Sequence, residues 1–151
     1  MGYDIEVAET AEQPTAVVAL ATTWPDLPAE AGAAFDDVWA FLRDDGQEGL
    51  RSDGHNVILY KDGVPHAEVG VIVTQAFDDA GRVTASVLPG ATVARTVHRG
   101  SYEHLADAHQ AVHSWCADNG YGVTGVRWEV YGDWHEDESR LETEVAWVLA
   151  T

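Results

Sequence analysis

The chain has 151 residues, of which 46% are hydrophobic and 23% are charged. This length and composition are those of a globular protein with one domain and a buried core, and no apolar run approaches the roughly 20 residues of a membrane span. The formal net charge of −18, from 8 Lys and Arg against 26 Asp and Glu, argues against nucleic-acid binding, because that requires a basic surface that displaces counterions from phosphate.

Cysteine content and the N-terminal residues give two further expectations. The chain holds one cysteine, Cys116, which excludes an internal disulfide and is expected to be a small buried side chain. The N-terminus lacks the basic and apolar segments of a signal peptide, so we expect a cytoplasmic protein without a membrane anchor.

In chain order, the first half predicts a short leading strand and then a strand, a helix and two strands. The strands are expected over residues 5–9, 15–22, 56–60 and 68–73, which alternate in polarity or are rich in Val, Ile and Leu. A helix is expected over residues 29–45, because Pro28 and Glu30 suit its first turn and Asp45 with Gly46 suits its end. Its apolar stripe consists of Ala31, Phe35, Val38, Trp39 and Leu42.

The second half predicts the same order of elements. The strands are expected over residues 83–88, 92–98, 126–131 and 144–149, and a helix over residues 101–119. Ser101 is expected to cap this helix. Its apolar stripe consists of Leu105, Ala108, Val112 and Trp115.

The two β-α-β-β units, over about residues 15–75 and 91–151, match at one sequence offset. The matched pairs are Val17 with Val93, Trp39 with Trp115, and Glu68 with Glu144. Each unit would place one helix against one face of a sheet. The sequence therefore predicts an α+β fold for a single domain over residues 1–151, with two pseudo-symmetric units, a mostly antiparallel sheet and a central groove that suits a ligand.

The strand over residues 126–131 carries the candidate ligand-binding group. Side chains alternate across a strand, so Glu129 and Tyr131 share one face while Trp128 points to the other. A carboxylate among Trp, Val and Tyr is costly to bury without a partner. Glu129 is therefore either paired within the protein, for example with Arg127, or available to a ligand, and the strand by itself leaves both alternatives open.

Three motifs make the chain resemble the GyrI-like small-molecule-binding family. They are His98-Arg99-Gly100-Ser101-Tyr102-Glu103-His104-Leu105, Leu88-Pro89-Gly90 and Trp128-Glu129-Val130-Tyr131. The resemblance covers almost the whole chain and implies that Glu129 lies at the floor of the groove, where it meets cationic aromatic ligands. The same domain is the effector-binding part of multidrug-responsive bacterial transcription activators. Because the chain has no room for their helix-turn-helix module, we expect no direct control of transcription, and the net charge of −18 predicts no direct DNA binding.

The resemblance leaves three functions open. The first is a stand-alone protein that binds hydrophobic, aromatic, cationic compounds of the multidrug type. The second is a hydrolase of strained cyclopropane-bearing natural products, in which Glu129 would act on water and Tyr131 would steady the departing group. The third is a modulator that interacts with DNA gyrase.

Apart from Glu129, the expected ligand-binding residues are aromatic. Tyr131 shares the face of Glu129, and Tyr60 is the repeat-related counterpart of Tyr131; a cation–π contact with such a ring contributes about 0.5–2 kcal/mol. Trp39 could instead pack in the core, and Tyr102 could instead pack against the start of the helix. The full expected set is Glu129, Tyr131, Tyr60, Trp39, Tyr102 and Trp147.

The histidines indicate neither a metal nor a cofactor. His109 and His113 have the i, i+4 spacing of a helical metal pair, but no Glu follows the first of them as in H-E-x-x-H, so both are expected to be surface side chains. His98 is expected to make a local hydrogen bond, and residues 133–138 are expected to form a solvated acidic loop.

Overall fold

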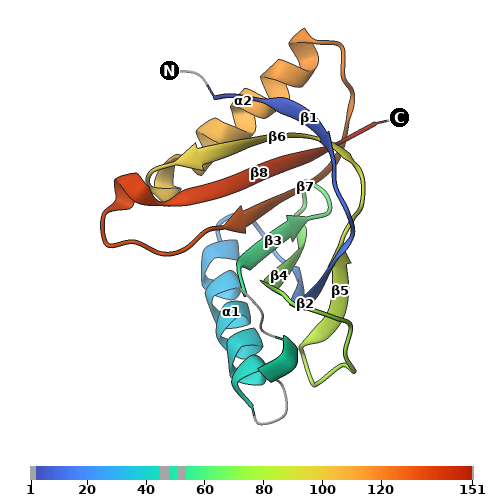
Figure 1. Cartoon of the computed structure of the whole chain (residues 1–151), viewed down its shortest axis with the longest axis vertical. Coiled ribbons are helices and arrows are strands. Elements are labelled where there is room, and N and C mark those ends of the chain that lie inside the picture. The colour runs from blue at the N-terminus through green and yellow to red at the C-terminus, as the bar shows by residue number, and fades with distance from the viewer. Residues whose placement is uncertain (1–2, 45–47, 51–53, 151) are drawn as a thin grey trace.

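The computed structural model describes residues 3–44, 48–50 and 54–150. Its strands are β1 (Glu6–Glu9), β2 (Gln13–Ala21), β3 (Asn56–Tyr60), β4 (His66–Ile72), β5 (Thr84–Leu88), β6 (Thr92–Arg99), β7 (Val123–Tyr131) and β8 (Glu142–Leu149) (Figure 1). Its helices are α1 (Leu27–Arg43) and α2 (Leu105–Asp118), with short 3-10 turns at Glu48–Leu50, Tyr102–His104 and Glu138–Arg140.

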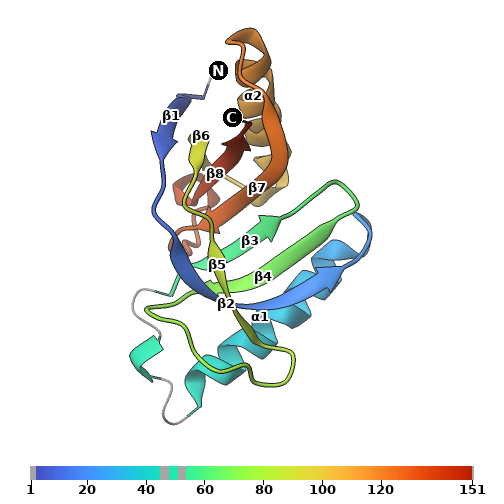
Figure 2. The ribbon, with the colours of Figure 1, turned by 90° about the vertical axis from the view of Figure 1, so that its right-hand side faces the viewer.

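The eight described strands form one sheet, in which every neighbouring pair is antiparallel. Their order is β1-β6-β8-β7-β3-β4-β2-β5. This order is symmetric about the β7–β3 pair, since β6, β8 and β7 on one side correspond to β2, β4 and β3 on the other. Figure 2 shows that the strands beside α2 run steeply across those beside α1, as expected of a strongly twisted sheet. The predicted α+β fold with an antiparallel sheet is confirmed.

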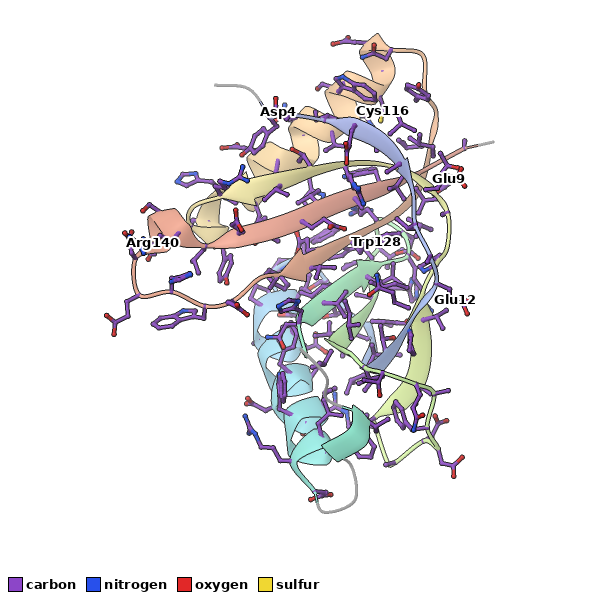
Figure 3. All side chains as sticks on the ribbon, viewed as in Figure 1. Asp4, Glu9, Glu12, Cys116, Trp128 and Arg140 are labelled. Carbon is purple, nitrogen blue, oxygen red and sulfur yellow. The ribbon has the colours of Figure 1, made fainter. Side chains whose placement is uncertain are left out.

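Both helices cover the same face of the sheet, as the sequence predicts. In β3, Ile58 packs under α1 while its neighbour Val57 points to the opposite face. In β8, Val145 packs under α2 while Ala146 points to that same opposite face. The opposite face has its own apolar cluster around Trp128, which Figure 3 places where the two groups of strands meet. Glu129, next to Trp128 in β7, therefore faces the helices.

The apolar stripe of α1 is close to the predicted one. The helix buries Leu27, Ala31, Ala34, Val38 and Leu42. Phe35 and Trp39, which the sequence places on the same stripe, are only half-buried and lie at its edge. The predicted helix end at Asp45 and Gly46 lies outside the described residues, and the helix ends at Arg43 with Asp44 as its C-cap.

The stripe of α2 differs from the prediction at one position. The helix buries Leu105, Ala108, Val112 and Cys116, so the expectation for Cys116 is confirmed. Trp115 is only half-buried, because it packs at the end of the helix against Tyr121, with stacked rings whose centroids are 5.5 Å apart.

Several element boundaries differ from the predictions. The helix predicted from residue 101 begins with a 3-10 turn, which Ser101 caps by accepting a hydrogen bond from the backbone N–H of Glu103 over 3.2 Å. Strand β7 begins at Val123 rather than at residue 126, and its pairing with β8 is irregular between Val123 and Arg127. Gly125, in this irregular stretch, has a φ of 92°, which glycine adopts at little steric cost. Neither α1 nor α2 has the length and apolar character of a membrane-spanning helix.

Candidate functional site

Glu129 lies in β7, opposite Ile58 of β3, and only 5% of it is exposed. Its Oε1 accepts hydrogen bonds from the hydroxyl groups of Tyr60, over 3.1 Å, and of Tyr131. Its Oε2 lies 2.7 Å from Nε2 of His109 on α2. Both oxygens of this buried carboxylate are therefore hydrogen-bonded, which is what its burial requires.

His109 is held from its other ring nitrogen by Trp147 of β8. The indole N–H of Trp147 donates to Nδ1 of His109 over 3.0 Å. Because an indole N–H can only donate, Nδ1 is an acceptor and the ring proton lies on Nε2, where it is donated to Glu129. The side chain of His109 is only 17% exposed, so the prediction of a surface histidine is wrong at this position. His113 is exposed, with its ring 5.4 Å from that of Trp147.

The two phenols beside the carboxylate are strongly perturbed acids. Burial raises the pKa of Tyr60 and of Tyr131 well above the usual value, and the adjacent negative charge of Glu129 raises both pKa values further. The cause is that ionisation would place a second negative charge in poorly hydrated surroundings. Both hydroxyl groups therefore stay protonated in neutral solution and donate to Glu129.

Arg127 shares the helix-facing side of β7 with Glu129 and lies among aromatic rings. Its guanidinium carbon is 5.0 Å from the ring centroid of Trp147, 5.1 Å from that of Tyr60 and 5.7 Å from that of Trp24. These are distances for cation–π contacts. Burial lowers the pKa of Arg127.

The polar contacts of Arg127 are with backbone atoms. Its Nη1 donates to the carbonyl oxygens of Gly125, over 2.9 Å, and of Asp62, over 3.4 Å. Among the described residues, no carboxylate forms an ion pair with this guanidinium. The pairing of Arg127 with Glu129, which the sequence left open, is not made.

Two cavities flank the carboxylate on the helix face of the sheet. The smaller, the Arg127 pocket, has a volume of about 310 Å³ and is lined by Trp24, Tyr60, Ala106, His109, Arg127, Glu129 and Trp147. The larger, the aromatic pocket, has a volume of about 520 Å³ and is lined by Phe35, Trp39, Gly54, His55, Asn56, Tyr102, Tyr131, Gly132, Asp133 and Trp134.

Tyr60 lines the Arg127 pocket and Tyr131 lines the aromatic pocket, and both donate to the same oxygen of Glu129. The carboxylate therefore lies between the two cavities. Helix α1 contributes Phe35 and Trp39 to the aromatic pocket, and α2 contributes His109 to the Arg127 pocket. This arrangement places both cavities between the two helices, where the sequence predicts a groove.

The walls of the aromatic pocket are organised by ring contacts around Tyr131. Its ring meets Tyr102 edge-on at a centroid distance of 5.4 Å and Phe35 at 6.4 Å. The indole N–H of Trp39 donates to the side-chain oxygen of Asn56 over 2.8 Å, which fixes this indole at the wall. Trp134 is 70% exposed and lies at the rim.

The six residues expected at the site divide between the two cavities. Tyr131, Tyr102 and Trp39 line the aromatic pocket, whereas Glu129, Tyr60 and Trp147 line the Arg127 pocket. The sequence interpretation did not include His109, Arg127, Trp24, Phe35 or Trp134 as lining residues. His109 had a signal, because it follows Leu105 by four residues and precedes Val112 by three, at the edge of the apolar stripe.

His98 makes the local contact expected of it, and the described residues contain no metal-binding cluster. The local hydrogen bond expected of His98 is present, since its Nε2 lies 2.9 Å from the carbonyl oxygen of Ser101, and its Nδ1 lies 2.9 Å from the hydroxyl of Tyr3. In the part of the chain that the structure describes, no three His, Cys, Asp or Glu side chains are grouped so that they could hold a metal ion.

Solved structures with the same fold come from proteins of several kinds. The C-terminal domain of EcmrR has 20% identity and a TM-score of 0.80, and the match covers 100% of this chain and 99% of that domain. EcmrR is also known in a complex with DNA, where the match covers 58% of its chain. SAV2435 bound to tetraphenylphosphonium has 12% identity and a TM-score of 0.63, with 99% and 94% covered. A hydrolase from Listeria innocua has 9% identity and a TM-score of 0.61, with 99% and 93% covered.

At these identities the structural likeness establishes the fold alone, and family membership comes from the sequence. A comparison with curated proteins gives no significant match. Residues 4–149 match the family described as the GyrI-like small molecule binding domain, which is nearly the full length of the chain. The chain belongs to the GyrI-like small-molecule-binding domain family.

Proposed function

We propose that this chain binds bulky, hydrophobic aromatic compounds, organic cations among them, in the aromatic pocket beside Glu129. The observation that carries the proposal is the state of the buried carboxylate. Its donors are the neutral phenols of Tyr60 and Tyr131 and the Nε2–H of His109. These contacts satisfy its hydrogen bonding without forming an ion pair, and the carboxylate lies next to a cavity lined by aromatic rings.

Electrostatics favour a cation in this cavity. An exposed ion pair contributes only about 0.2–1 kcal/mol. The attraction between a cation and a poorly hydrated carboxylate is stronger, because little water screens it. Tyr131 donates its hydroxyl proton toward Glu129, which makes its ring more electron-rich and a better cation–π partner. Asp133 adds a second carboxylate at the rim. SAV2435, which has the same fold, is known bound to the bulky cation tetraphenylphosphonium.

Calorimetry with tetraphenylphosphonium and the neutral triphenylphosphine oxide tests this proposal. The wild-type chain should bind the cation more tightly than the neutral compound. Trp39→Ala removes a wall of the aromatic pocket and should weaken the cation by about tenfold or more, which is about 1.4 kcal/mol. Trp115→Ala is the matched control, because Trp115 lies on the other helix and lines neither pocket. Absence of cation binding, or equal losses in both variants, would contradict the proposal.

Hydrolysis is a second candidate, favoured by the hydrogen-bonded chain from Trp147 through His109 to Glu129. This chain orients a carboxylate beside protonated phenols. In such a reaction, Glu129 would accept a proton from water while the water oxygen bonds to a cyclopropane carbon. The ring bond would break, and the released electron pair would take a proton from a tyrosine hydroxyl, which Glu129 then restores.

Mass spectrometry after incubation with a cyclopropane-bearing compound separates the two candidates. Hydrolysis predicts a free product that carries one added water, whereas binding alone predicts the recovery of unchanged compound. A modulating contact with DNA gyrase is not proposed, because the observations above concern a small-molecule cavity and favour no protein partner.

A further inference from the structure

The Arg127 pocket contains one positive and one negative group that do not pair with each other. The guanidinium of Arg127 lies over aromatic rings, and the carboxylate of Glu129 is bonded by phenols and an imidazole. The formal charges of these two groups cancel. The pocket therefore offers a ligand two separated polar groups, one donor and one acceptor, rather than a net charge.

Both groups retain hydrogen-bonding capacity. Both hydrogen bonds of the Arg127 side chain start from Nη1, and in the described structure its Nε and Nη2 have no acceptor. A carboxylate has about four acceptor positions. In Glu129, Oε1 accepts from two hydroxyl groups and Oε2 from His109 alone. Spare donors on Arg127 and a spare acceptor position on Oε2 of Glu129 thus line one cavity.

The walls of the Arg127 pocket suit a flat group. Trp24 and Tyr60 have ring centroids 5.7 Å apart, and the indole N–H of Trp24 donates to the carbonyl oxygen of Gly63 over 3.1 Å, which fixes it near the mouth. Trp147 completes the aromatic surroundings. With a volume of about 310 Å³, the cavity is smaller than the aromatic pocket, and its rings can stack on a planar system.

Arg127 also determines which charges the pocket accepts. Its guanidinium already occupies the cation–π positions on Trp24, Tyr60 and Trp147. An organic cation in the same cavity would lie within a few ångströms of this charge, in surroundings that screen it poorly, and would be repelled. The attraction of Glu129 for a cation is therefore offset on this side of the carboxylate.

We propose that the Arg127 pocket is a subsite for a neutral, planar, polar group and that Arg127 excludes organic cations from it. The group carries a carbonyl oxygen that accepts from Arg127 and an N–H or O–H that donates to Glu129, as aromatic lactams and related carbonyl compounds do. The proposal rests on the proposed function, because it assigns a second ligand class to the same site. The two cavities then select differently, cations in the aromatic pocket and neutral carbonyl compounds beside Arg127.

A pair of three-ring probes tests this assignment. Acridone is neutral and has a carbonyl and an N–H on opposite edges, whereas 9-aminoacridinium has the same frame and a positive charge. Arg127→Met keeps the apolar stem and removes the charge and the donors. It should weaken acridone by about tenfold or more, as expected for the loss of a charge-assisted hydrogen bond, and it should tighten 9-aminoacridinium. Arg82→Met is the matched control, because Arg82 pairs with Asp37 on the exposed surface outside both pockets.

Three outcomes decide the question. Unchanged acridone affinity in Arg127→Met, or no gain in 9-aminoacridinium affinity over the wild type in that variant, overturns the assignment of this subsite. If tetraphenylphosphonium still binds in that case, the proposed function stands without it. If the wild type binds none of the three probes, both proposals fail. If circular dichroism shows that Arg127→Met does not fold, Arg127→Lys replaces it. The Lys variant keeps the charge but loses the planar donor set. Its affinity for acridone should therefore fall, while the cation should still be excluded from the pocket.

Discussion

The indole N–H of Trp147 and Nδ1 of His109 lie 3.0 Å apart, and this bond determines which nitrogen of the imidazole carries the proton. With Nδ1 as an acceptor, Nε2–H points at Oε2 of Glu129 over 2.7 Å. A residue on β8 thus controls, through α2, how a carboxylate on β7 is hydrogen-bonded. Trp147 lines the Arg127 pocket, and the same side chain also orients the acid at its floor.

Trp147→Phe should release this control, because it keeps an aromatic ring and removes the N–H. We expect the free energy of unfolding to fall by about 0.5–1.5 kcal/mol, the net contribution of one hydrogen bond. Nitrogen NMR of the imidazoles should show Nδ1 of His109 unprotonated in the wild type and a mixture of tautomers in the variant. Trp115→Phe, which removes an indole N–H outside the pockets, is the control. Identical His109 spectra in the wild type and Trp147→Phe would contradict the tautomer assignment.

Glu129→Gln should affect both stability and charge selectivity. The new NH₂ group must face either the two tyrosine hydroxyls or the N–H of His109, all of which are donors in the wild type. We expect a loss of about 1–3 kcal/mol in unfolding free energy, the cost of an unsatisfied buried polar group. Affinity for tetraphenylphosphonium should fall by about tenfold or more and that for triphenylphosphine oxide much less. Any hydrolytic activity should disappear, since an amide is not a base at neutral pH.

Calorimetry and chemical denaturation of Glu129→Gln should be compared with Glu136→Gln, which changes the same charge in the exposed loop. Equal losses of affinity for the cationic and the neutral ligand would mean that the charge of Glu129 does not discriminate between them. Unchanged stability and unchanged affinity would mean that the carboxylate has neither role.

The loss of stability at alkaline pH should depend on the raised pKa values of the two buried tyrosines. Because the pKa values of Tyr60 and Tyr131 are raised in the folded state, the unfolded chain loses these protons first. Their contribution to the free energy of unfolding is therefore complete below about pH 10, the pKa of an unperturbed tyrosine. Above that pH, the free energy of unfolding falls by up to about 1.4 kcal/mol per pH unit for each group. Urea denaturation across this range should show a shallower decline for Tyr60→Phe than for the wild type. Tyr121→Phe, on the exposed surface, is the control, and equal slopes for Tyr60→Phe and the wild type would rule out this linkage.

Trp39 and Trp115 occupy corresponding positions on the two helices but should differ in function more than in stability. Full burial would make each Ala variant lose about 3–5 kcal/mol. Because both side chains are only half-buried, we expect about 1–3 kcal/mol from each, within the ordinary range of single substitutions. Thermal denaturation checks these values, and a loss above that range at either position would show a core role that its partial exposure does not suggest.

Duplex DNA should bind negligibly at physiological salt. The net charge of −18 repels phosphate, and 8 Lys and Arg against 26 Asp and Glu offer little positive charge to displace counterions from it. A gel-shift titration with the isolated chain checks this expectation, and a specific complex at that salt would refute it. EcmrR, which has the same fold over part of its length, is known in a complex with DNA.

The parts of the fold that depend on local patterns could be predicted from the sequence. Alternation in residues 126–131 placed Glu129 and Tyr131 on one face, and the matched units predicted two helices on one side of an antiparallel sheet. Either Trp115, three residues after Val112, or Cys116, four residues after it, could continue the buried stripe of α2. The sequence favoured the larger Trp115, whereas the structure buries Cys116. Which of the two is buried depends on the space between α2 and the sheet, and the spacing of apolar residues gives no information about that space.

The centre of the site could be predicted only in part, because its contacts join residues far apart in the chain. Tyr60 and Glu129 meet across the β3–β7 ladder. The repeat placed Tyr60 in the groove as the counterpart of Tyr131 but did not predict this hydrogen bond. His109 meets Trp147 and Glu129 only because of how α2 packs over β6 and β8. Arg127 reaches Trp24 because the loop before α1 folds back over β3 and β7, and no residue pattern near Trp24 indicates this.

The β3–β7 ladder would also transmit the effect of ligand binding from one half of the molecule to the other. Four residue pairs, from Val57 opposite Val130 to Tyr60 opposite Arg127, join the strands beside α1 to the strands beside α2 within the sheet. The aromatic pocket spans this seam, with Trp39 from one side and Tyr102 from the other. A compound bound there would contact both sides of this ladder and would restrict the motion of one helix relative to the other. A partner that contacts both helices would sense the bound compound without touching it.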